Sequence, residues 1–277
     1  MAEASIDIGA LVATHDFSPE AKSKLANLLD AAINNTASRT DAAEAAADGI
    51  DQLCPRNEDA EGYLWSLWTL FIDISKRIPL DDARIQSLVE VVKKLKAKQG
   101  GSIEIWGSPS SLWADLPLFG PVMRDAWNAT PNFDSSPEEA TKIAQWISLN
   151  SFAARLLGSS VQSWTNFALW ELRDGLEEPL PTQQAKDTHL ITASEWITHA
   201  GRVLEGEGQK GTQLDENDTR ALAAGTLLVE GGSGFSETRW RFWSKRLEEL
   251  GADAGAEAKN RAEKALEVIR SLGVESS

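Results

Sequence analysis

Two residues in one apolar segment have the types and the spacing for acid–base chemistry. Glu195 and His199 are four residues apart, so they share one face of a helix and can act as a linked pair. A neutral histidine can donate a hydrogen bond to a ligand carbonyl, and Arg173 can polarise a carbonyl in the same way. We therefore predict His199, Arg173 and Glu195 as catalytic residues. The alternative is that His199 bonds Glu195 or a backbone carbonyl inside the core.

Tryptophan is the unusual part of the composition. The chain has 11 tryptophans among 277 residues, but a single tyrosine, Tyr63. An indole is a large apolar group with one N–H donor, so these residues line a pocket for a bulky apolar ligand or fill a thick core. We expect the pocket among the aromatic helical segments at the centre of the chain. The predicted substrate-binding residues are Trp146, Asn150, Trp170, Trp196, Trp240 and Trp243.

The sequence predicts no metal site. Metal-binding histidines recur at short helical spacings, and no such spacing relates His15, His189 and His199. Asp81 and Asp82 resemble the start of the magnesium motif of class I terpene cyclases, but Arg84 and Ile85 follow without a third acid. A helix cap explains the aspartate pair better.

Nucleotide and nucleophile motifs do not occur either. The glycine-rich segment 231–234 is followed by no Lys-Ser or Lys-Thr pair, so a linker is the simpler interpretation. No Gly-x-Ser-x-Gly elbow is present. The single cysteine, Cys54, has no neighbouring base to activate it. We accordingly predict that the protein uses no cofactor.

Charge and hydropathy exclude other classes of protein. With 27 basic and 42 acidic residues the formal net charge is 27 − 42 = −15, and nucleic-acid binding needs a basic surface. The richest apolar run, residues 63–74, is shorter than the ~20 residues that cross a bilayer. The first twenty residues lack the basic start of a signal peptide. We expect a soluble cytoplasmic protein with no nucleic-acid partner and no membrane span.

Helical periodicity and helix-start signals set the expected fold. Ser18-Pro19-Glu20 and Ser136-Pro137-Glu138-Glu139 combine an N-cap residue with proline at the first helical position. The pattern predicts an all-α protein, a single orthogonal bundle of roughly ten helices without significant sheet. We expect an N-terminal helical extension over 1–58, a main domain over 59–255, and a last helix within 256–277 that belongs to the same domain.

Four segments carry more specific expectations. Residues 99–117 are expected to form a loop in which 103–106 is extended without a strand partner. Helices are expected over 161–178 and 215–229. The last helix, 256–272, is mostly polar, so it is expected to be the least buried.

Five ordered segments carry a resemblance to a known family. They are LPLFGP through DAWN in 116–128, LNSFAARL in 149–156, FALWELRD in 167–174, EWITHAG in 195–201 and SGFS through WRFW in 233–243. In this order the sequence resembles a fungal family catalogued only as a domain of unknown function, number 3632. The resemblance spans about residues 60–250 and implies a fungal source and an all-helical fold. It implies no activity and no catalytic residues.

Two kinds of function fit these observations. One is a cofactor-independent isomerase or cyclase of secondary metabolism, which closes a ring in a small apolar metabolite by a pericyclic or cycloaddition-type step. Holding a flexible substrate in a reactive pose suits a tryptophan-lined pocket without metal or nucleophile. The alternative is a non-catalytic helical scaffold or ligand-binding protein, which needs fewer assumptions. A closed tryptophan-lined cavity with converging polar groups would favour the enzyme.

Overall fold

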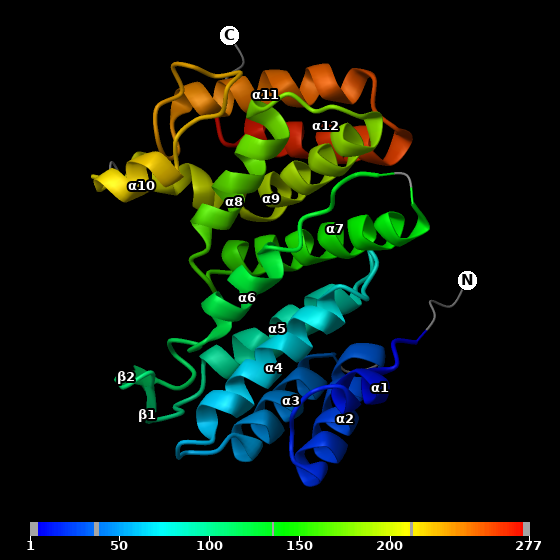
Figure 1. The fold of residues 1–277 in the computed structure, drawn as a ribbon, viewed down its shortest axis with the longest axis vertical. Coiled ribbons are helices and arrows are strands. Elements are labelled where there is room, and N and C mark those ends of the chain that lie inside the picture. The colour runs from blue at the N-terminus through cyan, green and yellow to red at the C-terminus, as the bar shows by residue number, and fades with distance from the viewer. Residues whose placement is uncertain (1–4, 36–38, 135, 211–212, 274–277) are drawn as a thin grey trace. The chain divides into compact units, whose positions relative to one another are not determined.

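The computed structural model describes residues 5–35, 39–134, 136–210 and 213–273, and it is dominated by helices (Figure 1). Helices make up 66% of the chain, which confirms the all-α fold class. In these described ranges there are twelve α-helices, one π-helical turn and one two-stranded hairpin. None of those helices is long and apolar enough to cross a membrane.

The chain divides into two compact units. One unit contains Met1–Pro131 and Ala144–Leu149, and the other contains Asn132–Ile143 and Asn150–Ser277. The predicted domain boundaries after residues 58 and 255 lie inside these units and stay predictions.

The first unit contains six helices and the hairpin. Helices α2, α3 and α5 pack against one another, and α4 packs against α1 and α6. At its centre the Trp68 ring stacks on Phe119 at 4.3 Å, and the Trp68 indole N–H donates to the Pro117 carbonyl over 2.8 Å. The helices are α1 (Ile8–Ala13), α2 (Pro19–Asn34), α3 (Arg39–Leu53), α4 (Ala60–Ser75), α5 (Arg84–Lys96) and α6 (Phe119–Trp127).

The second unit is organised around the long helix α9. Helix α12 packs along α9 more extensively than any other described helix pair, and α8 and α11 also contact α9. Six residues of α7, Ala144–Leu149, belong to the first unit. The elements are α7 (Pro137–Gly158), α8 (Thr165–Leu172), the π-helical turn η1 (Arg173–Glu177), α9 (Gln183–Gln209), α10 (Glu216–Ala221), α11 (Glu237–Ala252) and α12 (Ala256–Ser271).

Both helix-start signals are confirmed. The Ser18 hydroxyl accepts from the Ala21 N–H at the start of α2, and the Ser136 hydroxyl accepts from the Glu139 N–H at the start of α7. Glu139 departs from the usual reciprocal cap, because its buried carboxylate accepts from the backbone N–H groups of Asn132 and Phe133. It therefore ties the preceding segment to α7.

The prediction of an unpaired extended piece within a loop was wrong. Strand β1 (Ser102–Ile105) pairs antiparallel with β2 (Ser108–Ser111), in the register Ile105 to Ser108. The two turn residues, Trp106 and Gly107, both have positive φ, at 51° and 75°. This is the type I′ turn, which matches the twist of a two-residue hairpin. The pairing was missed because type I′ turns favour asparagine or aspartate before glycine, and a tryptophan stands there.

Three helix predictions also need correction. The region expected to be one α-helix over 161–178 contains two elements. Helix α8 ends at Leu172, and the π-helical turn η1 follows it directly. The helix expected over 215–229 ends at Ala221. The polar helix α12 is not peripheral, since it buries Arg261 and several alanines against the unit.

We expect Trp106→Asn to leave the free energy of unfolding unchanged or to raise it by up to about 1 kcal/mol, because asparagine tolerates positive φ better than tryptophan. Urea unfolding measures this. Ile105→Ala is the matched control, because it removes a buried side chain of the same hairpin and should destabilise by about 2 kcal/mol or more. A loss above about 1 kcal/mol for Trp106→Asn would show that the indole is structural.

Candidate functional site

Glu195 and His199 form the linked pair that their spacing predicts. On α9, His199 Nε2 lies 3.2 Å from Glu195 Oε2; the His199 side chain is 22% exposed and that of Glu195 is buried. The same carboxylate oxygen accepts from the Ser151 hydroxyl of α7 over 2.7 Å. The other oxygen accepts from Arg261 Nη1 of α12 over 3.1 Å. Glu195 therefore joins three helices of the second unit.

The electrostatics of this network keep Glu195 ionised. Burial alone would raise the pKa of Glu195, but the hydrogen bonds from His199 and Ser151 and the charge of Arg261 outweigh it, and the net pKa is lowered. The Ser151 hydroxyl donates to this carboxylate. In a catalytic triad the histidine lies between the serine and the carboxylate. Here the carboxylate of Glu195 lies between Ser151 and His199, so the arrangement is not that of a triad. The arrangement can orient His199 as an acid–base group. It can equally serve only to hold α7, α9 and α12 together.

Close backbone packing fixes His199 further. A Cβ at Gly158, the last residue of α7, would lie 1.8 Å from the His199 carbonyl oxygen. Only glycine permits this approach.

Arg173 and Trp170 meet at a single carbonyl. The Trp170 indole N–H and Arg173 Nη1 both lie within hydrogen-bond distance of the Ala221 carbonyl, at 3.1 and 3.2 Å. Arg173 Nε also pairs with Asp174 at 3.0 Å. These two predicted site residues thus hold the end of α10. The predicted catalytic role of Arg173 stays a prediction.

The other predicted ligand-binding residues lie in the protein core. The Trp196 indole N–H donates to Asn150 Oδ1 over 2.8 Å, and both residues are fully buried. Trp243 packs edge-on against Trp240 with ring centres 5.1 Å apart. Trp240 and Trp196 belong to the second unit, while Trp146 belongs to the first, where it packs against Trp127. Their predicted role in ligand binding stays a prediction.

Two further buried ion pairs were missed by the sequence analysis. Arg239 and Glu177 are both fully buried and form a bidentate pair at 2.7 and 2.9 Å. The Trp243 indole and the Gly225 N–H also donate to Glu177. In the other pair His189 Nδ1 lies 3.1 Å from Glu171 Oε1. Burial lowers the pKa of His189, but the bond to Glu171 and its charge raise it more, so the net pKa is raised.

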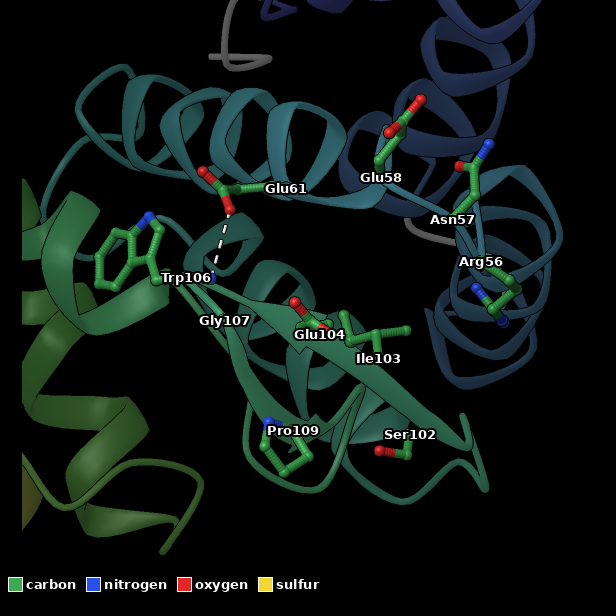
Figure 2. Close-up of a pocket in the computed structure, with 10 residues that line it drawn as sticks. All are labelled: Arg56, Asn57, Glu58, Glu61, Ser102, Ile103, Glu104, Trp106, Gly107 and Pro109. Carbon is green, nitrogen blue, oxygen red and sulfur yellow. Dashed lines mark hydrogen bonds between the residues drawn. The ribbon is translucent and has the colours of Figure 1, made fainter.

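A pocket of the first unit lies between the hairpin and the segment that leads into α4 (Figure 2). It has a volume of about 610 Å³. Trp106 stands at its edge with 63% of its surface exposed, and its backbone N–H lies 3.5 Å from Glu61 Oε2 of α4. The residues that line it are Arg56, Asn57, Glu58, Glu61, Ser102, Ile103, Glu104, Trp106, Gly107 and Pro109.

The lining of this hairpin pocket is negatively charged. Glu58, Glu61 and Glu104 have no basic partner among the residues that the structure describes. Arg56 is already occupied, because it pairs with Asp51 at 2.6 Å and donates to the Cys54 carbonyl. An aromatic face beside carboxylates that have no basic partner can bind an organic cation. The signal in the sequence was Trp106 directly before a glycine, in a segment that was expected to be a loop.

Comparison with known proteins identifies a family but no activity. The family described as "Protein of unknown function (DUF3632)" matches residues 68–247, so the chain belongs to it. Neither the curated proteins nor the solved structures give a significant match. The matched range contains the hairpin, Glu195 and His199, whereas Arg261 lies outside it. Among the described residues, no group of three or more His, Cys, Asp or Glu side chains is placed to hold a metal ion.

The stabilising effect of Glu195 should depend on pH. The pKa of Glu195 is lower in the folded protein than its ordinary value of about 4.5. The ionised carboxylate therefore stabilises the fold at pH values above about 4.5, and this stabilisation is lost as the pH falls through the pKa of the folded state. At pH 7 Glu195→Gln should lower the free energy of unfolding by about 3 kcal/mol, because it removes the buried charge that Arg261 meets at 3.1 Å.

Chemical unfolding of wild type and Glu195→Gln between pH 7 and pH 4 measures this difference. The gap should narrow as the pH falls below about 4.5. Glu267→Gln, at an exposed position of α12, is the control and should show a small difference at every pH. A gap for Glu195→Gln that stays constant down to pH 4 would contradict the assignment of an ionised Glu195.

Proposed function

We propose that this member of the family is a ligand-binding helical protein whose hairpin pocket takes a small organic cation carrying two or more amines. The observation that carries the proposal is Trp106. It stands in a positive-φ position that disfavours its side chain, yet it leaves 63% of its surface in solvent. Residues held in sparsely populated backbone regions cluster at active sites and ligand-binding sites.

The size and charge of the pocket support this class of ligand. A volume of about 610 Å³ lies within the range of small-molecule sites. Three carboxylates without basic partners, Glu58, Glu61 and Glu104, give several points for ammonium groups. The indole of Trp106 adds a cation–π contact, worth about 0.5–2 kcal/mol.

Isothermal titration with spermidine tests the proposal. We expect saturable binding to the wild type, weakened about three- to tenfold by Trp106→Asn through loss of the cation–π contact. Glu61→Gln and Glu104→Gln should weaken it by similar factors, and added salt should weaken it further.

Glu216→Gln is the matched control, because it removes one exposed carboxylate of the second unit. A chain of net charge −15 attracts any polyamine weakly. Should Glu216→Gln weaken spermidine binding as much as Glu61→Gln, the attraction would be general and the proposal wrong.

The second candidate is the cofactor-independent cyclase or isomerase, acting on a small apolar metabolite of fungal secondary metabolism. The observation that favours it is the Glu195–His199 pair, in which a buried carboxylate orients a partly exposed imidazole. Such a pair can move a proton or polarise a carbonyl. In this case the tryptophans of α7 and α9 would line the site and hold the substrate in its reactive conformation.

His199→Gln tests the enzymatic alternative. If His199 acts on a substrate, the variant should keep the melting temperature within a few degrees and lower turnover by about tenfold or more. The assay incubates both proteins with one mixture of apolar metabolites and follows products of unchanged mass and altered retention time, as ring closure by isomerisation requires. A lower melting temperature with unchanged activity of the folded fraction would make His199 structural.

The acidic composition of the chain supports the expectation that it does not bind nucleic acid. With a net charge of −15 it offers little to a phosphate backbone. Its single cysteine, Cys54, is buried, and burial raises the pKa of its thiol to about 12. We propose the cytoplasm as its compartment, where such a thiol stays unreactive.

A further inference from the structure

We propose that a second pocket of the first unit, between α1 and the connection from α4 to α5, binds an amphipathic organic anion, namely a carboxylate on an aliphatic chain. This α1 pocket has a volume of about 560 Å³. It shares no lining residue with the hairpin pocket, so the inference does not rest on the function proposed above. The lining residues are Ser5, Ile6, Asp7, Ala10, Leu11, Thr14, Arg77, Pro79 and Arg84.

One wall is a single face of α1. Asp7, Ala10, Leu11 and Thr14 recur at intervals of three and four residues, which places them on one side of a helix. A different face of α1 carries the buried residues Ile8 and Val12, which anchor the helix to the unit. The face toward the pocket therefore offers apolar surface, chiefly from Leu11 and Ala10, between two polar ends.

The polar ends of that wall are already satisfied. Asp7 accepts from the Ala10 N–H over 2.8 Å as the cap of α1. The Thr14 hydroxyl donates to the Leu11 carbonyl over 2.7 Å. Neither group needs a ligand to complete its hydrogen bonding, although Asp7 still places a negative charge at the edge of the pocket.

The opposite wall holds two arginines in different states. Arg84 is buried and neutralised, because its Nε lies 2.7 Å from Asp82 Oδ2 and its Nη1 lies 3.4 Å from Asn34 Oδ1. Arg77 is exposed, and within the described parts of the chain its guanidinium has no ion pair or hydrogen bond. Of the three charged residues that line the pocket, Asp7 accepts a backbone N–H and Arg84 pairs with Asp82, whereas the Arg77 guanidinium makes neither kind of contact within the described residues.

This combination selects the chemistry of the ligand. A guanidinium presents a planar fork of donors that matches a carboxylate in a bidentate way. Leu11, Ala10 and Pro79 beside it suit an aliphatic chain, which gains about 0.8 kcal/mol for each methylene buried. An anionic head at Arg77 and a tail along α1 use both features at once.

Isothermal titration with sodium decanoate below its micelle concentration tests the inference. We expect one saturable site on the wild type, weakened about tenfold or more by Arg77→Gln because a charge-assisted contact is lost. Arg202→Gln, which removes an exposed arginine of α9 in the second unit, is the matched control and should leave the affinity unchanged.

A second variant addresses the apolar wall without disturbing the core. Ala10 is exposed, so Ala10→Glu should keep the melting temperature while its added carboxylate weakens decanoate binding. The inference is overturned if decanoate shows no saturable site, if Arg202→Gln weakens binding as much as Arg77→Gln, or if decylamine binds as tightly as decanoate. The last outcome would mean that the pocket has no preference for an anionic head, so that Arg77 does not set the charge of the ligand.

Discussion

The second unit depends on a constraint on its buried glutamates, three of which are paired with a histidine or an arginine. An ionised carboxylate inside a protein costs several kcal/mol unless it is paired and hydrogen-bonded. Glu171, Glu177 and Glu195 are all buried, and each takes a histidine or arginine from another element. Removing one partner of such a pair costs about 3–5 kcal/mol, so each pair fixes which elements must be neighbours. Glu177 by itself contacts two further elements, α11 through Arg239 and the loop after α10 through the Gly225 N–H.

The same constraint explains what several of the buried tryptophans do. A buried indole needs an acceptor for its N–H. Trp243 donates to the paired carboxylate of Glu177, Trp196 donates to Asn150, and Trp68 donates to the Pro117 carbonyl. These indoles are committed to the fold, in the way that side chains of a core are. Trp240 differs, since its buried indole nitrogen has no hydrogen-bond partner in the described structure. Its ring packs edge-on against Trp243. Trp106 differs in the opposite sense, because most of its surface is in solvent.

The sequence predicted local features well and long-range pairs poorly. Helix starts such as Ser136 follow from hydrogen bonds within one turn, and the contact of Glu195 with His199 follows from helical spacing, so both were predictable. The partners from distant segments were not, because nothing local to Arg261 marks it as the base that meets Glu195, 66 residues away. For the same reason the polar helix α12 was expected to be the least buried, although its arginine completes a buried network. The hairpin was missed for a different reason, since its turn violates the residue preference by which such turns are recognised.

Local charge, and not the net charge of −15, decides what each pocket can hold. At physiological ionic strength the screening length is about 8 Å, so distant carboxylates act weakly on a bound ligand. In the hairpin pocket Arg56 is taken by Asp51, and the carboxylates that remain favour a cation. In the α1 pocket Asp82 neutralises Arg84, so Arg77 is the remaining cation that can meet an anion, opposite the capping carboxylate of Asp7. Internal pairing thus sets the sign at each site, by selecting which charged side chains stay available to a ligand. Ligands of opposite charge at two pockets of one acidic unit are therefore physically consistent.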